Sequence, residues 1–392
     1  MENSDKMLPE EMFIVATLMN KKLNRQSNFE FIRILAMLFI VVRHFCFYSG
    51  FDSTESELLI NNVWITAVRP LGKLGVDLFV LVSGYFLAGR SHVTIKKTAT
   101  LWGQIFFYSA LIFIFSVLHN PSNYSFGQML ESFLPISYNG LWFTKTYFMF
   151  FLLTPFLDMI LNNLSKRGHG TVILLFLLCW TLVPGELQEE LQYSDLLWFC
   201  FLFFVAAFIK KWENNVKLSP AKCFLMFGIV YLILGGYKII SLHNREIMKT
   251  YKPYTMNSIF NLLCSLFIFL GFKNIQIKSP KVNRAVNLIA SATFGVYLIH
   301  DNNYVRDVLW EKAFKGPEMI NSPYLILYGT AAALIVFCVC IVIDLARIYS
   351  VERIFVKAVD KYEPAFKALL IKAYGLITEI AVKFRNLLLA KK

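Results

Sequence analysis

The hydrophobic stretch formed by residues 28–49 constrains this chain more strongly than any other part of its sequence. Its sequence, NFEFIRILAMLFIVVRHFCFYS, is long enough to cross a bilayer as one helix, which takes about 20 mostly apolar residues. The same stretch nevertheless contains four ionisable side chains: Glu30, Arg33, Arg43 and His44. A charged group near the bilayer centre costs about 2.5–3.5 kcal/mol on insertion scales, so such groups usually face protein or water. We therefore expect a membrane-spanning helix with one functional face.

Arg33 and His44 are expected to share that face. At about 100° and 1.5 Å per residue, the sequence interval between them returns to within about 20° of the same direction and spans about 16 Å of the helix axis. One stripe of the helix then carries a permanent cation near one end and a titratable imidazole near the other. A simpler interpretation also stays open, in which Arg33 reaches the lipid headgroups and His44 lies in the interfacial layer.

The composition is that of an integral membrane protein rather than a soluble domain. Hydrophobic residues make up 57% of the 392 residues and charged residues only 17%, compared with about 25% in soluble globular domains. The seven cysteines lie in or beside apolar runs without a C-x-x-C pair, so we expect small buried hydrophobic residues, with no disulfide framework and no metal site. Four histidines are expected to be ordinary surface residues in loops: His92, His119, His169 and His243.

Hydrophobic segments along the chain predict an all-α integral membrane protein, a bundle of about ten transmembrane helices. They cover residues 28–49, 74–88, 101–118, 142–161, 171–183, 196–209, 223–237, 259–272, 286–300 and 324–345. An even number of spans places both termini on one side. Lys and Arg are concentrated on that side, whereas the opposite loops 119–140 and 184–195 contain none. The positive-inside rule thus predicts cytoplasmic termini, and topology explains the net charge of +13 without a nucleic-acid partner.

This topology divides the chain into a cytoplasmic N-terminal segment (1–27), a transmembrane domain (28–348) and a basic amphipathic cytoplasmic tail (349–392). No signal peptide is expected, because the first hydrophobic run is too long and lacks a small-residue cleavage site. The segment beginning at Met19 resembles a natural amino terminus, which makes residues 1–18 a candidate upstream extension. Apolar and basic residues alternate at helical spacing in the tail, which predicts a helix lying on the anionic inner leaflet. Docking of this helix on a partner protein is the alternative.

Two further segments carry polar residues that are unusual in lipid-embedded sequence. Asp77 is expected to start a helix, where a carboxylate complements the helix dipole, and its alternative is a plain interfacial residue. Ser83 belongs to a Ser-Gly pair that allows close helix packing. Lys145 lies one turn inside a predicted membrane edge, near Trp142 and Tyr147. Alternatively, Lys145 reaches outward and the two aromatic residues join an interfacial belt.

Several polar groups fall at one predicted depth. His300, followed by Asp301, ends the ninth span at its outer edge. The groups that the topology places in the outer half of the membrane are His44, Asp77, Lys145, Tyr147 and His300. A common depth predicts one shared cavity, and sequence spacing alone does not establish that their helices adjoin.

Five motifs follow one another in a defined order. They are Arg33 and His44 with ten residues between them, GVDLFVLVSGYFL at 75–87, LWFTKTY at 141–147, FGVYLIH at 294–300 and IDLAR at 343–347. On these motifs, residues 25–348 resemble the acyltransferase-3 family, membrane enzymes that attach acetyl or related groups to sugars of envelope polysaccharides and glycolipids. The resemblance implies a multi-pass protein of a bacterial cytoplasmic membrane. The sequence departs from the family pattern at Arg43, and it shows none of the esterase-like (SGNH) domains that follow the last span in some members.

The resemblance implies the reaction and its participants. The donor is expected to be acetyl-CoA entering from the cytoplasm, with no bound cofactor, and the acceptor a hydroxyl of an exopolysaccharide or its lipid-linked precursor. Polysaccharide-assembly proteins or a second copy of the chain are candidate partners. The catalytic role falls on Arg33, whose guanidinium suits CoA phosphates or the thioester arm, and on His44, as general base or as acyl carrier. Expected substrate-binding residues are Asp77, Ser83, Trp142, Lys145, Tyr147, His300 and Arg43.

Three alternatives remain open at this stage. The donor is succinyl-CoA in related members, and the basic residues Arg43, Arg69, Lys73 and Lys145 would suit a succinyl carboxylate or an anionic glycan equally well. A transporter or flippase of a lipid-linked saccharide would also use intramembrane charges, but we find no inverted repeat in the sequence. A non-catalytic scaffold would not require Arg33 and His44 on one face. Binding of CoA distinguishes the enzyme from the other two classes.

Overall fold

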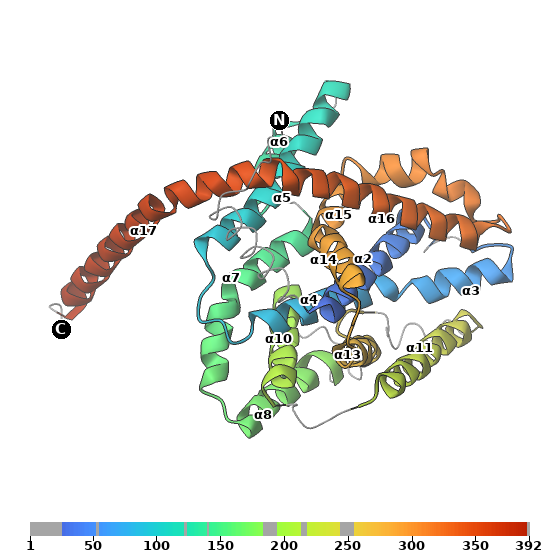
Figure 1. Cartoon of the computed structure of the whole chain (residues 1–392), viewed down its shortest axis with the longest axis horizontal. Helices are drawn as coiled ribbons and strands as arrows, with labels where there is room; N and C mark the ends of the chain where they lie inside the picture. Colours follow the sequence, from blue (N-terminus) through green and yellow to red (C-terminus); the bar gives the residue numbers. More distant parts are fainter. Residues whose placement is uncertain are drawn as a thin grey trace, which may run out of the picture.

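The computed structural model describes residues 26–51, 55–120, 124–138, 141–182, 194–212, 218–243 and 255–389, and these residues form helices and no strand (Figure 1). The α-helices are α2 (Ser27–Tyr48), α3 (Leu59–Val68), α4 (Leu71–Leu87), α5 (Ile95–His119), α6 (Phe126–Phe133), α7 (Trp142–Asn162), α8 (Lys166–Leu177), α10 (Asp195–Trp212), α11 (Pro220–His243), α13 (Ile259–Lys273), α14 (Pro280–Ser291), α15 (Thr293–His300), α16 (Leu325–Tyr349) and α17 (Val351–Leu389). Short π-helices lie at η2 (Leu178–Leu182) and η3 (Val308–Ala313), and a 3-10 helix at η4 (Gly316–Met319).

The helices are those of a membrane protein. Among the described residues, six helical stretches are long and apolar enough to cross a membrane: Ser27–Tyr48, Ile95–His119, Trp142–Asn162, Pro220–Tyr237, Pro280–His300 and Leu325–Ile380. A helix is present at each of the ten positions where the sequence predicts a span. The predicted all-α membrane fold is therefore confirmed, whereas the count of ten spans and the cytoplasmic termini stay predictions.

Helix α2, which carries Arg33 and His44, lies in the middle of the bundle (Figure 1). It contacts α4, α13, α14, α15 and α16, and its apolar side chains are buried among them. Gly75 lets α4 pack directly on α2, because a Cβ atom at this position would lie 2.5 Å from the carbonyl oxygen of Ala36. The unusual helix predicted from sequence is thus the core of the fold, and its polar residues are held by neighbours on several sides.

A buried polar cluster around Asp344 joins α16 to α5 and α17. The carboxylate accepts hydrogen bonds from Arg347 (Nε to Oδ1, 2.6 Å) and from the Tyr108 hydroxyl (2.7 Å). Arg347 also donates to Glu352 at 2.6 Å, in the first turn of α17. The IDLAR motif that contains Asp344 and Arg347 therefore connects three helices through charge-assisted hydrogen bonds.

The tail forms the predicted helix, α17, which extends beyond the bundle (Figure 1). Its beginning packs on α5, where the Phe355 ring covers Gly103 and Lys96 pairs with Asp360 at 2.7 Å. Further along, the large hydrophobic side chains are exposed, including Phe366 and Leu369. The contact with the inner leaflet stays a prediction, as does the alternative of a partner protein.

Two expectations are wrong, one about a histidine and one about two of the cysteines. His169 is not a surface loop residue but lies in α8 without exposed surface, where Nε2 is 2.9 Å from the Phe204 carbonyl oxygen and Nδ1 accepts from the Trp212 indole. The ring closes a contact between α8 and α10, and sequence gave no sign of this because Phe204 and Trp212 are distant along the chain. Cys179 and Cys338 are exposed on the protein exterior rather than buried, while the other five cysteines are buried as expected. His92 and His119 are exposed, and the side chain of His243 lies outside the described part.

Candidate active site

His44 and His300 form a hydrogen-bonded pair where α2 meets the C-terminal end of α15. The distance from His44 Nδ1 to His300 Nε2 is 2.9 Å, and Asp301 Oδ1 lies 3.4 Å from the same His44 nitrogen. His300 has no exposed surface, whereas the His44 side chain is 18% exposed. The structure therefore brings together two residues that the sequence placed at one depth, and it leaves only His44 accessible to a substrate.

The hydrogen bonds of this pair assign the protons. His300 Nδ1 lies 2.6 Å from the carbonyl oxygen of Val296, which can only accept, so this nitrogen carries the hydrogen. In a neutral ring, His300 Nε2 is then the acceptor, and His44 Nδ1 must donate to it. His44 consequently keeps an unprotonated Nε2. An imidazole held in this tautomer has the lone pair that a general base or a nucleophile needs.

A second chain of hydrogen bonds supports Asp301. Tyr48, one turn after His44 on α2, donates its hydroxyl to Asp301 Oδ1 at 2.6 Å. Arg306 donates to the Tyr48 oxygen at 3.3 Å and places its guanidinium carbon 5.0 Å from the centre of the Tyr48 ring. The carboxylate is thus fixed beside the His44 nitrogen, where it would stabilise a positively charged imidazole. Sequence reasoning missed the role of Tyr48 and Arg306; only the one-turn spacing of Tyr48 from His44 offered a signal.

Three cations surround His44. Arg43, Lys73 and Arg306 all lie within electrostatic range of its ring. Arg43 lies over Phe47, with 5.0 Å between guanidinium carbon and ring centre, and its stem packs on Gly72 of α4. The Lys73 ammonium lies 4.9 Å from the Trp142 ring centre. Trp142 is 36% exposed. Such surroundings favour a negative charge that develops near His44.

Arg33 lies about 16 Å from His44 along the axis of α2 and has different neighbours. Its guanidinium lies 3.5 Å from buried Glu30 and about 6 Å from the rings of Phe79 and Phe86 on α4. The Arg33 side chain is 24% exposed. Glu30 and two aromatic rings therefore hold an arginine whose charge remains accessible from one side.

Asp77 does not start a helix, contrary to expectation. Helix α4 begins at Leu71, so Asp77 lies well inside it and has no exposed surface. Its two carboxylate oxygens accept hydrogen bonds from the Trp198 indole (2.9 Å) and the Asn261 amide (2.7 Å). Asp77 thereby joins α4 to α10 and α13, and its contact with a substrate stays a prediction.

The remaining predicted substrate-binding residues lie along α4 and α7. The Tyr147 hydroxyl donates to buried Ser83 at 3.0 Å, and the Tyr147 ring packs against Phe79 and Phe143. Lys145 lies in the first turn of α7 and is partly exposed. Ser83 and Tyr147 therefore connect two helices, and Lys145 stays at the helix end where the sequence placed it.

The whole site lies within one recognisable sequence unit. The sequence profile of the acyltransferase-3 family, described as an acyltransferase domain, matches residues 26–345. The chain belongs to the acyltransferase-3 family. The match begins with α2 and ends within α16, so the domain of this acyltransferase includes both Arg33 and His44 and leaves out α17. No match was found among curated proteins or among solved structures.

Proposed function

We propose that this protein is a membrane O-acyltransferase that moves an acetyl group from cytoplasmic acetyl-CoA to a sugar hydroxyl. The acceptor is an extracellular or envelope polysaccharide of a bacterium, or its lipid-linked precursor. The observation that carries the proposal is the His44–His300 pair, which leaves His44 Nε2 unprotonated on a partly exposed side chain in a chain of an acyltransferase family.

In the proposed reaction, His44 Nε2 removes the proton of the acceptor hydroxyl as its oxygen attacks the thioester carbonyl carbon. The tetrahedral intermediate carries a negative oxygen, which Arg43, Lys73 and Arg306 stabilise from around the ring. Its collapse breaks the carbon–sulfur bond, and the departing CoA sulfur takes the proton from His44. Asp301, 3.4 Å from Nδ1, stabilises the imidazolium between these steps.

An acyl-histidine route uses the same geometry. In that route His44 Nε2 attacks the thioester itself, and CoA leaves as the thiol with the proton that the ring loses from Nδ1. The glycan oxygen then takes the acyl group from the ring, and the proton of its hydroxyl returns to the ring. The two routes differ in one observable. Only the second lets radiolabelled acetyl-CoA leave acetate attached to the protein when no acceptor is present.

Arg33 is proposed to hold the donor. Its partly exposed guanidinium suits the phosphates or the pantetheine arm of CoA, and Glu30 keeps it oriented. The distribution of Lys and Arg supports a cytoplasmic position for the Arg33 end of α2 and an outer position for the His44 end. The acyl group would then travel along α2 from Arg33 towards His44.

Succinyl-CoA is the second candidate donor, and one observation favours it. The cations that surround His44 would also bind the free carboxylate of a succinyl group. Side-by-side turnover of acetyl-CoA and succinyl-CoA decides between the two donors. A transporter or flippase of a lipid-linked saccharide would bind neither.

The test uses the detergent-purified protein and its His44→Ala variant, with His92→Ala as a control that removes an exposed histidine. We expect the wild type and the control to bind acetyl-CoA and to release free thiol slowly. His44→Ala should bind acetyl-CoA but release thiol about 10²–10⁴-fold more slowly, which is the usual contribution of general acid–base catalysis. Unchanged thiol release by folded His44→Ala would refute the role of His44, and absence of CoA binding by the wild type would favour transport.

A further inference from the structure

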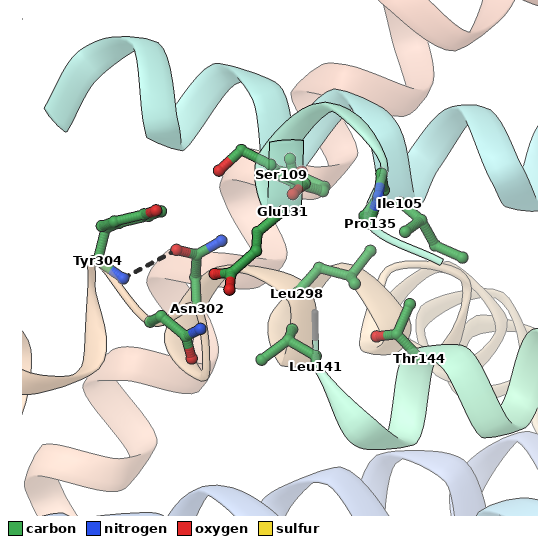
Figure 2. Close-up of a pocket in the computed structure, with 12 residues that line it drawn as sticks. Ile105, Ser109, Glu131, Pro135, Leu141, Thr144, Leu298, Asn302 and Tyr304 are labelled. Atoms are coloured by element: carbon green, nitrogen blue, oxygen red, sulfur yellow. Dashed lines mark hydrogen bonds between the residues drawn. The ribbon is translucent and has the colours of Figure 1, made fainter. Parts of the chain in front are cut away.

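A pocket lies on another side of α15, between α5, α6 and the beginning of α7 (Figure 2). It holds about 460 Å³ of space free of atoms, counting its open mouth. We call it the α5–α6 pocket. Its lining residues are Ile105, Tyr108, Ser109, Glu131, Ser132, Pro135, Leu141, Thr144, Leu298, Asn302, Asn303 and Tyr304.

The lining combines hydroxyls, amides and one carboxylate. Ser109, Ser132 and Thr144 supply aliphatic hydroxyls, Asn302 and Asn303 supply amides, and Glu131 supplies the carboxylate. Among the residues that the structure describes, the lining contains no Lys, Arg or His. Donors and acceptors in this mixture match a ligand rich in hydroxyl groups, and the lone carboxylate disfavours a ligand with negative charge.

Thr144, which belongs to the lining, has a buried hydroxyl group. Its side chain is 2% exposed, and its hydroxyl oxygen has no hydrogen-bond partner within the protein. Thr146, on the same helix, bonds instead to the Trp142 carbonyl oxygen at 2.9 Å. A buried hydroxyl without a partner is unfavourable, so an arriving hydroxyl group would gain a hydrogen bond there.

The groups on the opposite side of the pocket are held in place by their neighbours. The Tyr304 backbone N–H donates to Asn302 Oδ1 at 3.0 Å, and Figure 2 shows the Glu131 carboxylate pointing towards Asn302. The Tyr304 ring packs against Tyr124 and Phe113, with ring centres 5.7 and 5.6 Å away. Polar groups held in place beside an aromatic cluster provide both the hydrogen bonds and the flat apolar surface that a sugar ring can use.

One short stretch of chain separates this pocket from His44. Leu298 and Asn302 line the pocket, whereas His300 and Asp301, which lie between them in sequence, contact His44 and Tyr48. Successive helical residues turn by about 100°, so Leu298 and His300 point to nearly opposite sides of α15. A sugar ring in the pocket would therefore lie about one helix diameter from His44, the proposed base. At this distance the ring is too far from His44 to react, but it can belong to the same glycan as the ring that reacts.

We propose that the α5–α6 pocket binds a neutral sugar ring of the acceptor glycan, next to the ring that is acylated at His44. The inference rests on the proposed function for the identity of the acceptor. The ring would place its hydroxyls on Glu131, Asn302 and Thr144. This subsite selects acceptors by their neutral sugars, independently of the acyl donor.

The test measures sugar binding directly, by saturation-transfer NMR of the full-length protein in nanodiscs without acyl-CoA. The probes are neutral methyl glycosides of glucose, galactose and N-acetylglucosamine, with methyl glucuronide as the anionic comparison. Wild type is expected to bind at least one neutral glycoside and to bind the glucuronide at least about tenfold more weakly. Glu131→Gln and Thr144→Val should each weaken the neutral glycoside about tenfold, the effect of losing one hydrogen bond to a buried or charged group.

Matched control variants and a second measurement distinguish failure of the subsite from failure of the proposed acyl transfer. Glu318→Gln removes an exposed carboxylate and Thr146→Val removes a hydroxyl that bonds to the backbone, so both should bind like wild type. The subsite would be overturned if folded Glu131→Gln and Thr144→Val bound the neutral glycoside as tightly as wild type. It would also be overturned if wild type bound the glucuronide more tightly than the neutral glycosides. If His44→Ala binds the glycoside like wild type but wild type releases no thiol from acetyl-CoA, the pocket stands and the proposed acyl transfer fails.

Discussion

The His44 site and the α5–α6 pocket lie on two sides of the same short helix, α15, and differ in their charges. Three cations and one carboxylate surround the imidazole of His44, whereas the pocket contains one carboxylate and no cation among its lining residues. In the proposed reaction the first set of charges would stabilise a negative transition state, and in the proposed subsite the second would accept hydroxyl groups and repel anions. The fold thus places a cation-rich site and a pocket without a cation among its described lining residues on two sides of one helix.

The largest expected effect follows from removing the partner of His44. His300→Phe keeps a buried ring but takes away the acceptor for His44 Nδ1–H, so His44 loses the hydrogen bond that sets its tautomer. Thiol release from acetyl-CoA should fall about 10²–10⁴-fold, as in other catalytic pairs whose tautomer is wrong. His300→Gln, whose side-chain oxygen can accept from His44, should recover part of this loss. Equal rates for His300→Phe and wild type would remove the positioning role of His300.

A smaller effect is expected when only the charge beside His44 is removed. Asp301→Asn keeps the shape and an acceptor for the Tyr48 hydroxyl, but it no longer stabilises the imidazolium. We expect kcat to fall about tenfold to hundredfold with little change in the KM for acetyl-CoA, measured by steady-state thiol release. A rise in KM at constant kcat would instead assign Asp301 to donor binding.

One substitution tests the difference in charge between the two regions. Ser109→Lys places a cation in the wall of the α5–α6 pocket, where wild type has none among the lining residues. Binding of methyl glucuronide should strengthen about fivefold, because an exposed or half-buried ion pair contributes about 1 kcal/mol or less. Ala313→Lys, at an exposed position outside the pocket, adds the same charge and serves as the control for altered net charge. No gain in glucuronide binding would mean that the charge of the lining does not govern selection.

The smallest effect on chemistry is expected from the tail. The beginning of α17 is bound to α5 through Phe355 and Asp360, but the side chains that the structure describes beyond residue 363 are exposed. Deletion of residues 364–392 should leave thiol release within about twofold of wild type while weakening retention in vesicles that contain anionic lipid. Loss of turnover by a folded truncated protein would contradict the separation between tail and active site.

The sequence predicted the elements of the fold because the signals for them are local. A hydrophobic run of given length predicts a membrane helix, and the helical period puts Arg33 and His44 on one face. The ordered motifs predicted the acyltransferase-3 family, and the family match confirms it. The sequence also predicted one depth for His300 and His44, and the two rings are in contact in the structure.

Only the tertiary structure decided which of these residues meet. The contact between His44 and His300 joins positions 256 residues apart, and the role of Arg306 depends on a loop that folds back onto Tyr48. The structure likewise moved Asp77 from a predicted helix start into a buried contact between three helices. Periodicity tells which side of a helix is polar, but it does not tell which helix packs there. That choice is made by side-chain packing across the whole bundle, such as the close approach that Gly75 allows between α2 and α4.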